Sequence, residues 1–169
     1  FNNISIMFFE EPQNLDKAEE YLFKGIKIDP NYHLFNFNLG RLNNYRNEYE
    51  KAIEFFKKCI EVKPDFGPAY YYITTPYEEL GMYEEAEKNY LKAIELDAKD
   101  PDFYFDLGEL YEFYFKIYEK AISQYLKILE FENEDHVNAY YAIARIYFYV
   151  ISDNEKAIHL YEQTGFIEE

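Results

Sequence analysis

Apolar and polar residues alternate along this chain with the period of an α-helix, in short stretches that come in pairs. Prolines lie between the pairs, where they end one helix or begin the next. The pattern predicts a first helix in each pair near residues 1–11, 33–45, 68–80, 102–114 and 137–150. It predicts a second helix in each pair near residues 15–28, 49–62, 83–97, 118–131 and 154–164.

The paired helices repeat along the chain. An alanine recurs in every second helix, at intervals of 34, 34, 35 and 36 residues: Ala18, Ala52, Ala86, Ala121 and Ala157. Small residues recur in the first helices as well, at Gly40, Gly108 and Ala144. Small side chains at fixed places let the two helices of a hairpin cross closely. Because one hairpin cannot bury its apolar face alone, the hairpins must stack.

These residues resemble the tetratricopeptide repeat (TPR) family, whose template is W-x2-L-G-x2-Y, then A-x3-F, then P. The first part is matched by Tyr104, Leu107, Gly108 and Tyr111, with Tyr in place of Trp, and the second by Ala52, Phe56 and Pro64. The resemblance implies an all-α fold, a right-handed α-solenoid of stacked antiparallel helix hairpins. We expect one array over residues 1–169, with units at 1–32, 33–66, 67–100, 101–136 and 137–169. Its ends fall at repeat boundaries, as expected for a segment of a longer array.

The chain departs from the template at a few places. Thr74 replaces the expected Gly or Ala, and Asn43 stands where Tyr is expected. Pro76 falls inside the predicted helix 68–80, where it removes a backbone hydrogen bond and clashes with the preceding turn. We therefore expect that helix to be kinked or shortened near Pro76. The fourth and fifth units each carry one extra residue before their alanine.

The resemblance implies that one face of the first helices lines a concave groove that binds a peptide or protein segment. When the repeated alanine is numbered as repeat position 20, position 5 is aromatic in four units: Phe37, Tyr71, Phe105 and Tyr141. We interpret this row as a stacking stripe. The alternative is that the row packs as core against the neighbouring first helix. The candidate binding residues are Phe37, Asn38, Arg41, Tyr71, Tyr72, Thr75, Phe105, Asp106, Glu109, Tyr141 and Arg145.

The charge of the chain narrows the class of partner. The net charge is −16 and the pI is about 4.6, which argues against binding nucleic acid or anionic lipid. Arg41 stands at one end of the candidate groove, and the fourth unit is acidic, at Asp102, Asp106, Glu109 and Glu112. We therefore expect a protein or peptide partner with basic and apolar residues.

Some members of the family bind the C-terminal carboxylate of heat-shock chaperones through a clamp of Lys, Asn and Arg. Matched by position, this chain has Phe37, Tyr72, Asp102 and Asp106 where the clamp needs Lys, Asn, Lys and Arg. The two aspartates would repel a carboxylate. The chain is therefore not expected to bind a chaperone tail.

A second candidate contact lies at the hairpin turns. The turns near Arg46 and Gly81 have ordinary polar or glycine-containing sequences. The next two are apolar, with Phe113, Tyr114 and Phe115 in the fourth unit and Tyr149, Val150 and Ile151 in the fifth. An exposed apolar strip usually marks a contact. The alternative is that the extra residues extend each helix and bury these side chains.

No motif indicates catalysis, a cofactor or a metal. His33, His136 and His159 have no zinc-ligand spacing, and no phosphate-binding glycine loop occurs. The one cysteine, Cys59, occupies a position that the repeat reserves for a small buried residue. It needs no oxidising compartment, so an intracellular, cytoplasmic location is expected. The start of the chain does not resemble a signal peptide, and no apolar run is long enough to span a membrane.

Three functions remain open. The first is an interaction scaffold that binds a segment in its groove. The second is a structural subunit of a large multiprotein assembly, held through edges and ends, since the open faces of the end repeats favour association. The third is a regulatory segment of a larger enzyme whose catalytic domain lies elsewhere.

Overall fold

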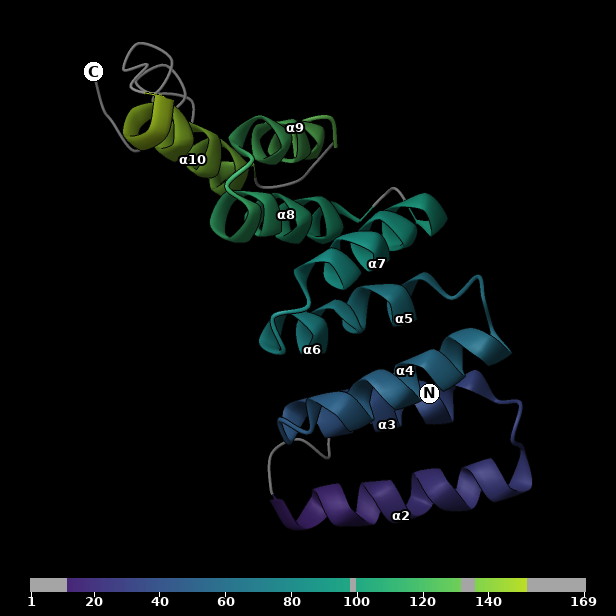
Figure 1. Ribbon diagram of the computed structural model, residues 1–169. Coiled ribbons are helices and arrows are strands. Elements are labelled where there is room, and N and C mark those ends of the chain that lie inside the picture. The colour runs from purple at the N-terminus through teal and green to yellow at the C-terminus, as the bar shows by residue number, and fades with distance from the viewer. Residues whose placement is uncertain (1–11, 98–99, 132–135, 152–169) are drawn as a thin grey trace. The chain divides into compact units, whose positions relative to one another are not determined.

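The computed structural model describes residues 12–97, 100–131 and 136–151 (Figure 1). All regular elements in these ranges are helical, and none is a strand. The predicted helices 1–11 and 154–164 lie outside the described residues. The chain divides into two compact units, residues 1–96 and 97–169. The elements are α2 (Pro12–Ile28), α3 (His33–Tyr45), α4 (Tyr49–Val62), α5 (Gly67–Tyr72), α6 (Thr74–Glu79), α7 (Tyr83–Leu96), α8 (Pro101–Glu109), η1 (Leu110–Phe115), α9 (Tyr118–Ile128), α10 (Val137–Ile146) and η2 (Tyr147–Ile151).

Within the first unit, neighbouring helices pack as the repeat pattern predicts. Helices α3 and α4 form one hairpin, and α7 packs against both α5 and α6 to form the next (Figure 1). Helix α2 packs against α3, and α4 packs against α5 and α6. The bounds of α3 and α4 match the predicted ranges residue for residue.

The small residues lie where the paired helices cross. A Cβ atom built on Gly40 would lie 2.7 Å from Cδ1 of Phe56, and one on Gly108 would lie 2.5 Å from Cε1 of Tyr125. The alanines of the repeat are completely buried opposite these contacts, at Ala52, Ala86 and Ala121. The interpretation of these residues as close-crossing points is therefore confirmed.

The helix that contains Pro76 is interrupted. Helix α5 ends at Tyr72, Ile73 forms a turn, and α6 begins at Thr74. Pro76 has no backbone N–H to donate to the carbonyl of Tyr72, so the α-helical ladder cannot continue through this point. Thr74 turns its hydroxyl to the backbone and donates to the carbonyl of Tyr71 at 2.6 Å. The predicted disturbance of helix 68–80 is confirmed.

The two hairpin turns of the first unit end in the same way. Asn47 (φ 58°) and Gly81 (φ 71°) adopt the left-handed conformation just after the first helix. The next residue donates its N–H back into that helix, from Glu48 to Asn43 and from Met82 to Tyr77, both at 2.8 Å. This is the Schellman ending, which satisfies carbonyls at the helix C-terminus.

In the second unit, the first helix of each pair ends in a π-helix. Helix α8 continues into η1, and α10 continues into η2. The left-handed residue of the α8–α9 turn is Lys116 (φ 58°), and Ile117 donates to the carbonyl of Tyr111 at 2.9 Å, one residue further back than in the first unit. A π-helical turn accommodates one more residue than an α-turn. The extra residue of the fourth repeat, residues 101–136, is therefore accommodated at the end of its first helix.

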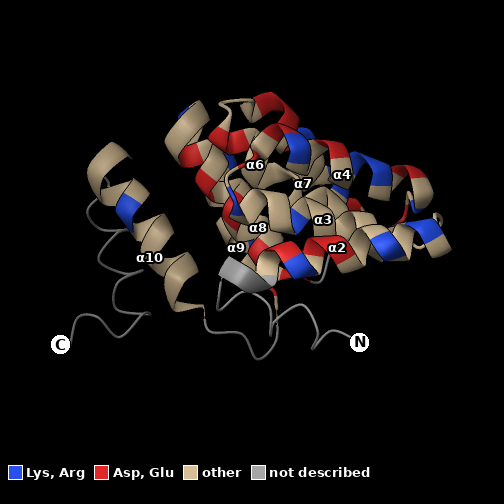
Figure 2. Ribbon diagram, turned by 90° about the horizontal axis from the view of Figure 1, so that it is seen from below, with Lys and Arg blue, Asp and Glu red and all other residues tan. Residues whose placement is uncertain are grey.

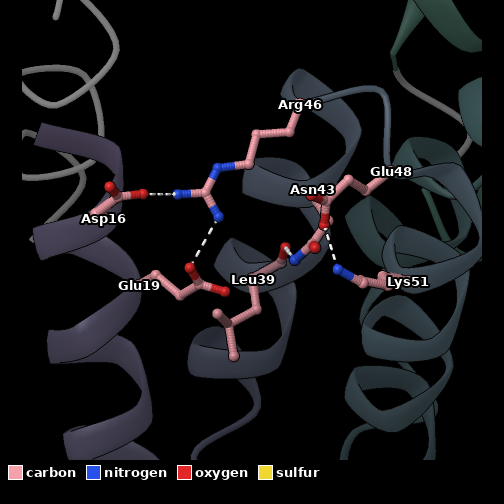
Figure 3. A network of polar contacts seen from close by, with 7 residues as sticks. All are labelled: Asp16, Glu19, Leu39, Asn43, Arg46, Glu48 and Lys51. Atoms are coloured by element: carbon pink, nitrogen blue, oxygen red, sulfur yellow. Dashed lines mark hydrogen bonds and ion pairs between the residues drawn. The ribbon is translucent and has the colours of Figure 1, made fainter. Parts of the chain in front are cut away.

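A polar network holds α2 against the end of α3 (Figure 3). The guanidinium of Arg46 donates from Nη1 to Oε2 of Glu19 at 2.8 Å, and from Nη2 to Oδ1 of Asp16. Asn43, which replaces the expected Tyr, is 1% exposed and donates from Nδ2 to the carbonyl of Leu39 at 2.7 Å. The amide thus takes its partner from its own helix, so the departure leaves the hairpin intact.

Cys59 is fully buried on α4, as predicted. Burial raises the pKa of its thiol to about 12, which keeps it protonated and unreactive at neutral pH. Across the described ranges, no group of three or more His, Cys, Asp or Glu residues is arranged to hold a metal ion. Nor is any helix in those ranges both long and apolar enough to cross a bilayer.

Candidate functional site

The candidate groove residues of the first unit lie on α3, α5 and α6. Phe37 is only 8% exposed. Its ring lies 5.9 Å from that of Phe56, 5.2 Å from Phe66 and 5.5 Å from Tyr72, measured between centroids. The prediction of Phe37 as an accessible anchor is corrected, because Phe56 and Phe66 of its own repeat and Tyr72 of the following repeat cover it. Here the alternative interpretation, packing as core, is the right one.

Tyr72 replaces Phe37 as the accessible aromatic of this region. It is 38% exposed, and its ring meets that of Tyr71 edge-on at 5.3 Å. The guanidinium carbon of Arg41 lies 5.3 Å from the centroid of Tyr72 and 5.8 Å from that of Phe37. Such stacking is favourable between a cation and the ring face. Arg41, Tyr71 and Tyr72 therefore form one cluster, which joins the first helices of two successive repeats.

The remaining predicted residues of the first unit differ in how much contact each makes with the rest of the protein. Asn38 donates from Nδ2 to the carbonyl of Leu34 at 2.9 Å, within its own helix. Thr75 is exposed on α6. Tyr71 is half-buried, with its ring 6.0 Å from that of Tyr90 on α7. The row of position-5 aromatics is therefore partly core and partly accessible.

In the second unit, α8 presents an acidic face. Phe105 is half-buried, with its ring 5.4 Å from that of Tyr125. Asp106 and Glu109 lie one turn apart on the same helix and are also half-buried. Burial, and then the neighbouring charge of Asp106, raise the pKa of Glu109. A cation placed beside these carboxylates would be attracted by both.

Glu112 does not belong to that acidic face. It is 5% exposed and accepts hydrogen bonds from Nε and Nη2 of Arg145, at 3.0 and 2.8 Å, and from the hydroxyl of Tyr125 at 2.9 Å. The prediction of Glu112 as part of an acidic rim is wrong, because Arg145 neutralises it. Burial, reinforced by the charge of Glu112, raises the pKa of Tyr125.

Arg145 is thereby held in place between repeats. Its guanidinium carbon lies 4.9 Å from the ring centroid of Phe113 and 5.7 Å from that of Tyr141. Tyr141 is 43% exposed, more than any other member of the position-5 row. The role of Tyr125 and Glu112 in fixing Arg145 was missed from the sequence. The signal was their repetition, since Tyr90 donates to Glu78 at 2.7 Å at the same places of the preceding repeat.

The apolar turns of the fourth and fifth units are exposed. Phe113, Tyr114, Tyr149 and Val150 have exposed fractions of 43, 48, 73 and 43%. Phe115 is half-buried, with its ring 6.0 Å from that of Tyr111. The side chain of Ile151 lies outside the described residues. The extra residues therefore extend the helices without burying these four side chains, contrary to the alternative drawn from the sequence.

Comparison with known proteins agrees with this architecture. A family model described as "TPR repeat" matches residues 77–112, and one described as "Tetratricopeptide repeat" matches residues 35–66. A solved structure of MamA superposes with a TM-score of 0.81 at 23% identity, covering 91% of this chain and 88% of that one. This match confirms the predicted fold class, an all-α solenoid of helical hairpins.

Curated relatives match the chain over a part of their length. The UDP-N-acetylglucosamine–peptide N-acetylglucosaminyltransferase of Giardia intestinalis is 31% identical over 96 residues, 57% of this chain and 6% of that protein. Heat shock protein STI1 of Saccharomyces cerevisiae is 30% identical over 90 residues, 52% of this chain and 15% of that protein. The TPR fold points to a non-catalytic repeat scaffold for protein interactions. The chain thus carries tetratricopeptide repeats, which the family models match at residues 35–66 and 77–112.

Proposed function

We propose that this scaffold binds a peptide or protein segment that carries apolar and basic residues, along the face of its first helices. The observation that carries the proposal is that each compact unit exposes an aromatic ring on a first helix, Tyr72 in the first and Tyr141 in the second. The second unit adds the half-buried carboxylates of Asp106 and Glu109. We also propose, from the repeat spacing, that all five units belong to one array.

The aromatic rings would provide most of the affinity. Rigid aromatic side chains offer a large contact area with little loss of conformational entropy, and such residues are enriched among interface hot spots. The stacking of Arg41 on Tyr72 holds that ring in one orientation before a ligand arrives. The carboxylates of α8 would mainly raise the association rate, so binding should weaken as salt increases.

The basic residues on this face favour the same partner. Arg145 is engaged by Glu112, and Arg41 is stacked on aromatic rings. Both positive charges are therefore partly compensated by contacts within the protein. The side chain of Asp102, in contrast, is exposed at the start of α8. A segment with lysine or arginine beside apolar side chains complements this arrangement better than an acidic one.

The test uses two synthetic peptides of equal length, one of alternating Leu and Lys and one of alternating Leu and Glu, titrated against the chain by fluorescence anisotropy. We expect the Leu–Lys peptide to bind more tightly. Replacement of Tyr72 by Ala should weaken it by about 1–3 kcal/mol. Tyr71→Ala and Phe105→Ala should weaken it too, by less, because those rings are half-buried.

A control separates charge from contact. Asp106→Asn together with Glu109→Gln should reduce the salt dependence of Leu–Lys binding and leave the fold unchanged by circular dichroism. Tyr21→Ala, at a ring that is 65% exposed on α2, should have no effect. Unchanged affinity in Tyr72→Ala and in the double variant would reject the proposal.

A second candidate is a structural subunit held through its edges. The exposure of Phe113, Tyr114, Tyr149 and Val150 favours it, because exposed apolar side chains grouped at hairpin turns usually mark a contact.

A further inference from the structure

The second unit carries a patch of exposed apolar side chains at and around its two π-helical turns. We call this patch the π edge. It comprises Phe113, Tyr114, Ile117, Phe148, Tyr149 and Val150, whose exposed fractions run from 39 to 73%. A π-helical turn inside an α-helix is rare and often accompanies function. Here two successive repeats end their first helix in this way.

Described contacts join η1 to α10, the helix that leads into η2. Arg145 of α10 bonds to Glu112 of η1 and stacks over Phe113 of the same turn. Beyond Arg145, the ring of Phe148 meets that of Tyr149 at 4.8 Å. η1 is therefore joined, through one guanidinium, to the helix that continues into η2.

The π edge itself contains no acidic side chain, unlike most of the chain. The whole sequence has 33 acidic and 17 basic residues, yet residues 113–118 and 137–151 contain no Asp or Glu. Figure 2 shows α10 without acidic colour and with a single basic residue, whereas α2, α4 and α7 carry both charges. Lys116 and Lys120 are exposed beside η1, and Nζ of Lys120 lies 4.6 Å from the ring centroid of Tyr111.

We infer that the π edge binds a protein segment with apolar side chains and carboxylates. Apolar contact would come from the exposed rings, and Lys116 and Lys120 would attract the carboxylates. The occupant differs in charge from the segment proposed for the groove, so the two surfaces do not compete for one partner. An anionic bilayer is a poorer candidate, because a chain of net charge −16 is repelled from it.

The test is selection of a displayed library of random 12-residue peptides on the 169-residue chain, followed by affinity measurement with synthetic copies. We expect one enriched class that combines Leu, Phe or Trp with Asp or Glu. Tyr149→Ser and Val150→Ser together should weaken that class at least tenfold. Lys116→Glu should weaken it severalfold, and less so at high salt.

The chain offers a matched control for these variants. Tyr45, at the corresponding turn of the second repeat, is 57% exposed, so Tyr45→Ser removes a similar ring without touching the π edge. It should leave the acidic peptides unaffected. Tyr72→Ala should also leave them unaffected while weakening the Leu–Lys peptide, so failure of the groove proposal is distinguishable from failure of this one.

Several results would overturn the inference. One is an enriched class without acidic residues, and another is binding that Tyr149→Ser with Val150→Ser does not change. Failure to enrich any class would overturn it too. Flotation with vesicles of phosphatidylcholine and phosphatidylserine that is lost in the same variant would show a lipid surface instead. A dimer in sedimentation that the variant dissociates would show a second copy as the occupant.

Discussion

Two hairpins, residues 33–62 and residues 101–128, have the same contact where their helices cross but different turns between their helices. In both, a glycine of the first helix lies under an aromatic ring of the second, Gly40 under Phe56 and Gly108 under Tyr125. The first hairpin ends its helix with an α-type Schellman turn, and the second ends it in a π-helix. An inserted residue is thus absorbed at the helix end, while the crossing point keeps its register.

The same two hairpins differ in whether the aromatic residue of the second helix makes a hydrogen bond. Tyr125 and Glu112 form a hydrogen bond that also holds Arg145 of the next repeat. In the first hairpin, the equivalent residues are Phe56, which has no hydroxyl, and Asn44. Oδ1 of Asn44 is buried and has no hydrogen-bond partner in the structure. At this repeat position, the hairpin of residues 101–128 is therefore tied to the following repeat by an ion pair, and the hairpin of residues 33–62 has none.

The largest expected effect comes from breaking that ion pair. Glu112→Ala would leave Arg145 and the hydroxyl of Tyr125 without their carboxylate, and should lower the free energy of unfolding by about 3 kcal/mol. Asn44→Ala, at the same repeat position, should cost less than about 1 kcal/mol, because its oxygen has no partner to lose. Urea denaturation followed by circular dichroism measures both. Equal losses would show that the two repeats do not differ in this respect.

The crossing glycines should respond alike, despite the different turns. Gly40→Ala and Gly108→Ala each place a methyl group against a fully buried ring. Without any shift, the added Cβ would lie 2.7 Å from Cδ1 of Phe56 and 2.5 Å from Cε1 of Tyr125. Overpacking of this kind should cost about 1–3 kcal/mol in each hairpin. Thermal unfolding of the two variants provides the measurement. A large loss for one and none for the other would mean that the π-helix lets its hairpin relax where the Schellman turn does not.

The turn residues should respond differently. Lys116 holds φ at 58°, which a lysine adopts only at a cost, so Lys116→Gly should stabilise the chain by up to about 1 kcal/mol. Asn47 has the same φ, but asparagine tolerates this conformation, so Asn47→Gly should gain only about a few tenths of a kcal/mol. Chemical denaturation compares the two. A loss of stability in Lys116→Gly would indicate that the lysine side chain stabilises η1 in some other way.

The smallest expected effect is on how the stability of the protein depends on pH. Burial and Asp106 raise the pKa of Glu109 above its usual 4.5, so the folded state disfavours the ionised form. The stability from this group is present below the unfolded pKa and is lost as the pH rises through the folded pKa. Glu109→Gln should therefore raise the melting temperature slightly at pH 7 and leave it unchanged near pH 4. An equal shift at both pH values would contradict this explanation.

The helical bounds and the interruption at Pro76 were predictable, because each depends on residues close in the chain. A period of 3.6 residues defines α3 and α4, and the missing N–H of Pro76 acts within one turn. Which residues of the candidate groove are exposed was less predictable. Phe37 and Tyr141 share a repeat position, yet one is core and the other is exposed, because exposure depends on which rings of other helices pack beside them.

By itself, the sequence determined the repeat, its small crossing residues and the family, since a fixed spacing of small and large side chains permits one kind of stacked hairpin. It also located the extra residues of the fourth and fifth units. Only the tertiary structure decided that those residues form π-helical turns with exposed aromatics, and that Glu112 is buried against Arg145. The physical reason is that burial and ion pairing join residues from different repeats, about 33 positions apart, whose distances no local pattern fixes.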